Sequence, residues 1–346
     1  MRVKDETDSA TGVAQSMPFA RSNIAAMEGY VPGEQPRDRT YIKLNTNENP
    51  YPPSPAVTET LHAFAANRLR LYPDPLAQAL REEAATQAGL DADWILCGNG
   101  SDDLLTIAVR TFVPEGGALA CPDPTYSLYP VLADIQGARC LTIPLDEAFE
   151  LPDNPLDGLD NAVLLFIARP NAPSGNAFPL AVMHELCRTF PGVVWIDEAY
   201  ADFAHDHCLE FVRQYPNVVV SRSFSKSYSL AGIRLGLAFA QPALIGEMMK
   251  VKDSYNVGML TQAVGLAALR DRAHMTANCR RICATRSATA EGLVDRGFEV
   301  LPSAANFLFA APPLPSEQYF TELRRRGILV RYFPGPRTGR FEIGRA

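Results

Sequence analysis

The feature that most constrains this fold is a series of short, β-rich apolar runs that alternate with helical patterns. Helical spacing fills the gaps between runs, for example over 101–112 and 180–190. Such alternation is typical of a mainly parallel sheet whose strands are joined by crossover helices. We therefore predict an α/β fold with strands at 94–98, 118–122, 162–168, 193–197, 218–224 and 235–240.

After about residue 270 the pattern changes to a long Arg- and Ala-rich helix followed by short strand-like runs, "FEVLP", "NFLFA", "ILVRYF" and "RFEIG". This change indicates a second, smaller α/β domain, completed by the segment before residue 50. The polar start of the chain lacks the apolar segment of a signal peptide, which favours a disordered tail. We expect a tail (1–20), an N-terminal segment of the small domain or dimer arm (21–50), a large domain (51–265) and a small domain, short at its C-terminus (266–346).

Charge and composition exclude several partners. The net charge of −7 argues against nucleic acid or an anionic membrane, because either would need a basic face. No apolar run approaches the roughly 18 residues of a membrane span. The seven cysteines include no CxxC pair, which indicates reduced thiols in a cytoplasmic protein. "HDHC" at 205–208 offers metal-type ligands without a second cluster, so we expect no metal site.

Residues whose side chains can bind a ligand or take part in catalysis follow the predicted strands. "CGNGSDD", "PDPTY", "RPNAPSGN", "DEAY" and "SFSK" come after the first five runs in turn. Parallel sheets place their binding site at the carboxyl ends of the strands. We therefore expect a Gly-rich turn, an aromatic ring, an Asn, an acid and a lysine to meet in one cleft.

The lysine, Lys226, has two interpretations. Most lysines are solvated, and a loop lysine needs no function. Alternatively its amine is a nucleophile that forms a Schiff base with an aldehyde such as pyridoxal phosphate. That cofactor needs a carboxylate at its ring nitrogen, donors for its 3-oxygen and a phosphate site.

All three requirements have candidates near the strand ends. Asp197 closes one predicted strand and suits the ring nitrogen, while Tyr200 and Asn171 suit the 3-oxygen. The turn "GNGS" opens a predicted helix, whose free N–H groups favour a phosphate. Hydroxyl and guanidinium donors to the same phosphate come from Ser223, Ser225 and Arg234.

Eight motifs together resemble the fold-type I pyridoxal-phosphate aminotransferases of the class I/II superfamily, from about residue 20 to 346. Within it, they are most similar to histidinol-phosphate aminotransferases. The motifs are "LNTNENPYPPSP", "LYPDP", "GNGSDD", "PTYSLYP", "PNAPSGN", "DEAYADF", "SFSKSYSLAGIRLG" and "RFEIG". The resemblance implies a large domain with a mainly parallel, seven-stranded-type sheet flanked by helices, and a smaller α/β domain.

The resemblance also implies residue roles. Lys226, Asp197 and Tyr200 would be catalytic, and Tyr126 would stack on the cofactor ring. Tyr72 would reach the neighbouring subunit's site, which implies a homodimer. The full implied cofactor set is Tyr72, Gly100, Ser101, Asp102, Tyr126, Asn171, Asp197, Tyr200, Ser223, Ser225, Lys226 and Arg234.

The implied reaction moves an amino group from histidinol phosphate to a 2-oxo acid, 2-oxoglutarate, in a ping-pong cycle. Tyr30, Asn49, Arg331 and Arg340 would bind the substrate. Aromatic aminotransferases and threonine-phosphate decarboxylases share much of this pattern, so both stay open. A non-enzymatic, cofactor-binding regulator also stays open. Two departures are Ala172 and Ser174, where many relatives have Asn and Thr, and the missing final helix that relatives usually carry.

Overall fold

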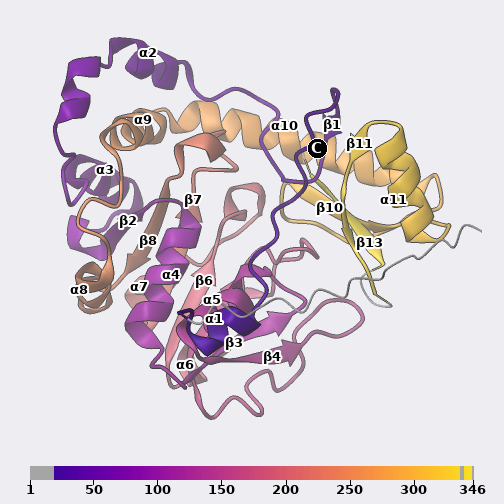
Figure 1. The fold of residues 1–346 in the computed structure, drawn as a ribbon, viewed down its shortest axis with the longest axis horizontal. Coiled ribbons are helices and arrows are strands. Elements are labelled where there is room, and N and C mark those ends of the chain that lie inside the picture. The colour runs from indigo at the N-terminus through magenta and orange to yellow at the C-terminus, as the bar shows by residue number, and fades with distance from the viewer. Residues whose placement is uncertain (1–18, 336–338, 345–346) are drawn as a thin grey trace, which may run out of the picture.

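A computed structural model describes residues 19–335 and 339–344 of the chain (Figure 1). Its largest element is a seven-stranded sheet in the order β2-β8-β7-β6-β5-β3-β4. Only β8 runs antiparallel to its neighbours among these strands. This arrangement confirms the predicted mainly parallel sheet, with strands β2 (Ile95–Gly98), β3 (Ala118–Asp123), β4 (Arg139–Pro144), β5 (Ala162–Ala168), β6 (Val193–Asp197), β7 (Val218–Ser223) and β8 (Gly236–Ala240).

Six of these strands match the predicted runs to within a residue or two, and β4 was missed. β4 lies at the edge of the sheet, and most of its residues are exposed or only half-buried. An edge strand needs little apolar burial, so its sequence carries a weak signal.

Alternate residues of the buried strands face opposite layers of helices. On β6, Val194 and Ile196 pack into one apolar cluster, while Trp195 packs into another. This period of two follows from strand geometry, and it leaves both faces of the sheet apolar. The helices on the Trp195 face are α4 (Ser101–Phe112), α5 (Leu128–Gln136) and α8 (Pro242–Val251), and those on the other are α3 (Gln78–Ala88), α6 (Leu180–Thr189), α7 (Phe211–Gln214) and α9 (Met259–Arg270).

The C-terminal lobe is built on a four-stranded antiparallel sheet in the order β12-β13-β10-β9. The run "ILVRYF" divides between two sheets, because β11 pairs instead with β1 from the N-terminal segment. The 23-residue α10 extends from beside α9 toward this lobe (Figure 1). The elements are β1 (Ile42–Lys43), α10 (Arg272–Val294), β9 (Glu299–Val300), β10 (Phe307–Ala311), α11 (Ser316–Arg325), β11 (Ile328–Leu329), β12 (Arg331–Phe333) and β13 (Arg340–Gly344).

Two further helices precede the sheet, α1 (Ser22–Ala26) and α2 (Pro55–Ala63). Pro55 begins α2 and the Ser54 hydroxyl caps it by accepting from Ala56 N, an arrangement that suits a helix start. Residues 1–18 of the predicted tail lie outside the described residues. Within the described part, no helix is long and apolar enough to cross a membrane.

Candidate active site

A cavity of about 290 Å³ lies where the large sheet meets the C-terminal lobe. Strands β5, β6 and β7 bring their carboxyl ends to it, and β12 and β13 supply the opposite wall. Because β8 runs the other way, its amino end arrives at the same edge. Most of the predicted site residues line this cavity: Tyr30, Ser101, Asp102, Tyr126, Asp197, Tyr200, Ser223, Ser225, Lys226, Arg234 and Arg331.

Lys226 follows β7 in a turn, and its amine points into the cavity. The Nζ atom donates a hydrogen bond to the Thr46 carbonyl over 3.0 Å. Burial lowers the pKa of this amine to about 8, although the nearby Glu342 carboxylate opposes the shift. About a tenth of the amine is therefore neutral at pH 7, far more than for an ordinary lysine, and the neutral form is the one that attacks an aldehyde.

Asp197, the last residue of β6, is only 5% exposed. Its carboxylate accepts hydrogen bonds from the Tyr129 hydroxyl (3.0 Å) and the Ser221 hydroxyl (3.2 Å). Burial raises its pKa to about 6, and these two hydrogen bonds hold it below a still higher value. A buried carboxylate with only neutral partners is suited to a cationic partner such as a protonated ring nitrogen.

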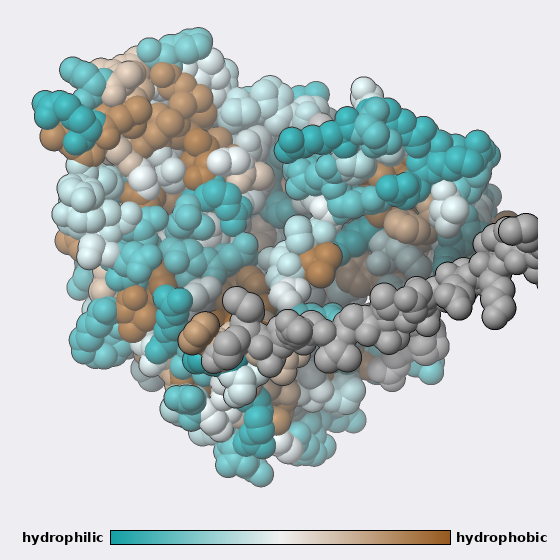
Figure 2. All heavy atoms as spheres, in the orientation of Figure 1, coloured by the Kyte–Doolittle hydropathy of each residue, from teal (hydrophilic) through white to brown (hydrophobic). Residues whose placement is uncertain are grey.

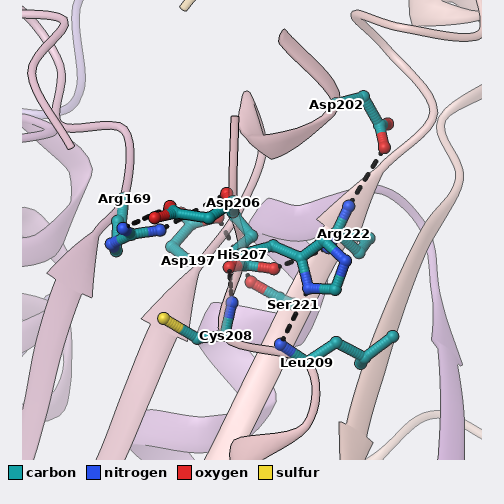
Figure 3. A network of polar contacts seen from close by, with 10 residues as sticks. Arg169, Asp197, Asp202, Asp206, His207, Cys208, Leu209, Ser221 and Arg222 are labelled. Atoms are coloured by element: carbon teal, nitrogen blue, oxygen red, sulfur yellow. Dashed lines mark hydrogen bonds and ion pairs between the residues drawn. The ribbon is translucent and has the colours of Figure 1, made fainter. Parts of the chain in front are cut away.

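A polar network holds the segment that follows Asp197 (Figure 3). Arg222 pairs with the buried Glu198 carboxylate (2.8 Å) and with Asp202 (3.0 Å). On the other side, buried Arg169 pairs with Asp206 over 2.6 Å. These ion pairs join β7 and the loop after β5 to residues 198–206, so Asp197 sits on a rigid support.

An anion-binding corner lies at the start of α4. Arg234 extends its guanidinium to the Ser225 hydroxyl (3.4 Å) and to Asp102 (3.2 Å). A Cβ added at Gly100 would lie 2.6 Å from Arg234 Nη2, and one added at Gly236 would lie 2.8 Å from the Gly100 carbonyl carbon. Only glycine allows this close approach of helix N-terminus, backbone and guanidinium, which together suit a phosphate.

Three tyrosines line the space between these groups. The Tyr126 hydroxyl donates to Asp102 (3.1 Å), and its ring makes an edge contact with Tyr30. Asn47 Nδ2 donates to the Tyr200 hydroxyl (3.2 Å), and Lys226 Nζ lies 5.6 Å from the Tyr200 ring centre. An aromatic face and a phenol are thus available beside the lysine.

Asn171 does not line the cavity. Its Nδ2 donates to the Pro124 carbonyl (3.1 Å) and to Ser174 Oγ (2.8 Å), and its Oδ1 accepts from the Thr125 hydroxyl (2.7 Å). These partners use both N–H groups of the buried amide and one lone pair of its oxygen, so the side chain braces the loop that carries Thr125.

Arg340 is also turned away from the cavity. Its guanidinium pairs with the Glu299 carboxylate and lies 5.9 Å from the Phe149 ring centre and 6.0 Å from that of Phe309. The side chain crosses β10 to reach Glu299 on β9, and it packs near the rings of Phe149 and Phe309. The position predicted to bind a substrate anion is therefore committed to the packing of the lobe.

Two other predicted residues lie outside the cavity wall. Asn49 Nδ2 donates to the backbone carbonyls of Lys226 (2.8 Å) and Ser227 (3.3 Å), so it fixes the lysine's turn. Tyr72 is 77% exposed and stacks on Tyr255 with ring centres 4.5 Å apart.

Sequence reasoning missed Glu342, which faces the cavity opposite Arg331. The two are cross-strand partners on β12 and β13, so their side chains share one face. Burial raises the pKa of Glu342, while Arg331 and Lys226 favour its charged form. Burial disfavours the Arg331 charge, but a hydrogen bond with Tyr30 and nearby negative charge raise its pKa overall. No local sequence signal sets this strand register, although Glu342 lies within the motif "RFEIG".

The HDHC segment forms no cluster of ligands. Asp206 is occupied by Arg169, and His207 Nδ1 accepts from Leu209 N. Among the residues that the structure describes, no three His, Cys, Asp or Glu side chains gather in a way that could hold a metal ion.

Comparison with known proteins identifies the family. The family model for aminotransferase class I and II matches residues 39–345. Histidinol-phosphate aminotransferase from Syntrophotalea carbinolica is 46% identical over 91% of both chains. The Geobacter sulfurreducens protein of the same name is 46% identical over 92% of both.

A crystal structure of histidinol-phosphate aminotransferase from Sinorhizobium meliloti, in complex with pyridoxal-5'-phosphate, shares the fold. It superimposes with a TM-score of 0.87 at 24% identity, covering 95% of this chain and 94% of the other. The predicted fold class and the prediction of a pyridoxal-phosphate transaminase are confirmed at the level of the family. From residue 39 onward, this chain belongs to the class I and II aminotransferase family.

Proposed function

We propose that this aminotransferase exchanges an amino group between histidinol phosphate and 2-oxoglutarate in a ping-pong cycle, with Lys226 as its central catalytic residue. One observation carries the proposal. A lysine with a pKa near 8 shares one cavity with a buried carboxylate, Asp197, and a corner of serine, arginine and helix N-terminus. Relatives at 46% identity bear the name histidinol-phosphate aminotransferase, which supports the choice of amino donor.

The residues present fit pyridoxal phosphate. When bound, the cofactor supplies an aldehyde for an amine and a ring that withdraws electrons from the substrate carbon. The corner built by Gly100, Ser101, Ser225 and Arg234, with Ser223 beside it, would hold the phosphate, and Asp102 would keep the guanidinium in place.

The ring has partners on each side. Asp197 would accept a hydrogen bond from the ring nitrogen, and Tyr129 and Ser221 orient the carboxylate for that contact. Tyr126 would cover one face of the ring, and the Tyr200 hydroxyl would donate to the 3-oxygen. The amide of Asn171 would act on the same region through the loop it braces.

Lys226 would then move the proton. Its neutral amine would accept a proton from the substrate carbon, and the resulting ammonium would return it to the cofactor's 4′ carbon. Glu342 and the Thr46 carbonyl stabilise that charged form at the cavity wall.

The substrate phosphate would meet Arg331 and Tyr30. Arg331 faces the cavity from β12, and the Tyr30 hydroxyl lies beside its guanidinium. A guanidinium and a phenol together provide charge-assisted hydrogen bonds to a phosphate. Arg340 would not take part, since Glu299 occupies it, and Asn49 would act only by holding the lysine's turn.

A homodimer would bury the apolar surface near α2. Figure 2 shows hydrophobic side chains gathered over the α2 and α9 region, and large exposed apolar residues there include Leu61, Leu69, Leu71, Tyr72 and Tyr255. We propose that a second copy covers this surface and that Tyr72 points toward the partner's cavity. We also propose that the protein is cytoplasmic and that its two domains span residues 51–265 and 266–346.

An absorbance spectrum of the purified protein tests the function. With pyridoxal phosphate bound, histidinol phosphate should remove a band near roughly 400–430 nm, and 2-oxoglutarate should restore it while glutamate forms. Phenylalanine and threonine phosphate, added in separate samples, test the alternatives. A spectral change with phenylalanine alone would instead indicate an aromatic aminotransferase, and release of carbon dioxide without an amino acceptor would indicate a decarboxylase.

A further inference from the structure

Two cysteines on neighbouring strands lie in contact, away from the candidate active site. Cys121 is on β3 and Cys140 is on β4, with their Sγ atoms 3.6 Å apart. The parallel register pairs Leu119 with Cys140 and Cys121 with Thr142, so the two thiols are diagonal neighbours on one face. Neither cysteine lines the cavity, so the proposed reaction makes no use of the pair.

The two thiols differ in access. Cys121 is 2% exposed, whereas Cys140 is only partly buried on the edge strand of the sheet. Contact with Cys121 lowers the pKa of Cys140, against the opposing effects of burial and the acids Asp134 and Asp123. The same contact raises the pKa of Cys121. The accessible sulfur is thus the better nucleophile, and the hidden one lies within reach of it.

Cysteines elsewhere in the described chain lack this arrangement. Cys279 and Cys283 share a helix face, but Cys279 donates to the Met275 sulfur and Cys283 to the Phe203 carbonyl. Burial alone raises the pKa of Cys187 to about 12, which makes it a poor nucleophile. A selective oxidant therefore has one suitable target pair.

We propose that Cys121 and Cys140 form a reversible oxidation site that reacts with small disulfides such as glutathione disulfide. The Cys140 thiolate attacks one sulfur of the disulfide, which joins glutathione to Cys140 and releases one reduced glutathione. The Cys121 sulfur then attacks Cys140, giving the protein disulfide and a second reduced glutathione. Two protein thiols are oxidised, one glutathione disulfide is reduced, and the two thiol protons leave with the products.

The disulfide would tie the edge strand to the strand that leads into the active site. Residues 121–140 enclose α5, so the new bond closes a strand–helix–strand loop. Just after β3 come Thr125 and Tyr126, which line the cavity. Closing the loop limits the freedom of the unfolded chain. Oxidation should therefore raise the free energy of unfolding of this edge without altering any residue of the cavity.

Intact-protein mass spectrometry of the full chain, equilibrated with glutathione redox buffers, tests the proposal. The wild type should lose about 2 Da, because two hydrogens leave, and dithiothreitol should reverse the loss. Peptide mapping should place the bond between Cys121 and Cys140. Cys121→Ser should instead stop at a glutathione adduct on Cys140, Cys140→Ser should form neither product, and the matched control Cys279→Ser should behave like the wild type.

Native wild-type protein provides a readout that does not depend on how the variants fold. Brief alkylation before oxidation should label Cys140 ahead of Cys121, and complete labelling of Cys140 should block the loss of mass. The proposal is overturned if the wild type keeps both thiols at every glutathione ratio, or accumulates only the adduct. It is also overturned if the Cys140→Ser variant still loses about 2 Da.

Discussion

The two walls of the candidate active site come from different kinds of sheet. The large-sheet wall, which carries Asp197, Ser223 and Lys226, is the edge where parallel strands end. The lobe wall, which carries Arg331 and Glu342, is one face of an antiparallel sheet. The predicted residues of the first wall nearly all reach the cavity, while one of the two predicted on the second, Arg340, does not.

This difference follows from strand geometry. At the end of a parallel strand the chain turns over the sheet's edge, so several successive residues are available to a ligand. Along an antiparallel strand only alternate residues share a face. Side-chain length and the neighbouring side chains then decide which of these residues reach a given point. Arg340 and Glu342 illustrate this, since they share a face of β13 but only Glu342 lines the cavity.

Removal of the lysine amine from the large-sheet wall should have the largest effect. Lys226→Ala should reduce turnover by about 10⁴-fold or more, because proton transfer and the attack on the aldehyde both depend on Nζ. The measurement is the steady-state rate of glutamate formation from histidinol phosphate and 2-oxoglutarate. Lys252→Ala is the matched control, since burial also lowers the pKa of Lys252 but that residue is outside the cavity. Normal turnover in Lys226→Ala would remove the basis of the proposed function.

We expect substitution of the two arginines of the lobe strands to have different effects on substrate binding and on stability. Arg331→Ala should raise KM for histidinol phosphate by roughly 10–100-fold, since a charge-assisted contact to the substrate phosphate is lost. Arg340→Ala should leave KM within about twofold and lower the free energy of unfolding by about 1–2 kcal/mol, through lost packing. Kinetics and urea unfolding of both variants measure these values. A larger KM effect in Arg340→Ala would mean that its side chain leaves Glu299 when substrate binds.

The two walls also interact electrostatically across the cavity. Removing this interaction should have the smallest effect of the three changes. Glu342 opposes the burial effect on Lys226, so Glu342→Gln should lower the pKa of the amine below its value of about 8. More of the amine is then neutral at a given pH, and its reactivity curve moves to lower pH. Competitive acetylation of the apoprotein at a series of pH values, with peptide mass spectrometry, reports this midpoint.

Glu299→Gln is the control for that shift, since its carboxylate is bound to Arg340 outside the cavity. It should leave the Lys226 midpoint unchanged. A midpoint that moves to higher pH in Glu342→Gln would contradict the electrostatic explanation.

Some of the fold was predictable, and its gaps have physical causes. The buried strands β5, β6 and β7 were found because both of their faces pack against helices, which makes them continuously apolar. The edge strand β4 was missed because it is only half-buried. The run "ILVRYF" was expected as one strand, yet pairing with β1 separates its first residues from the rest. That pairing joins residues nearly 300 positions apart, which no local pattern reports.

By itself, the sequence determined the order of the strands along the chain and the chemistry at their ends, because hydrophobic periodicity and strand-end residues are local properties. Tertiary structure decided which of those residues face the same space. It placed the Asn171 amide against the Thr125 hydroxyl and the Arg340 guanidinium against Glu299. It also made Glu342 the cross-strand neighbour of Arg331. It also brought two unremarkable cysteines into contact. Register, side-chain partners and burial depend on distant segments, so they exist only once the chain has folded.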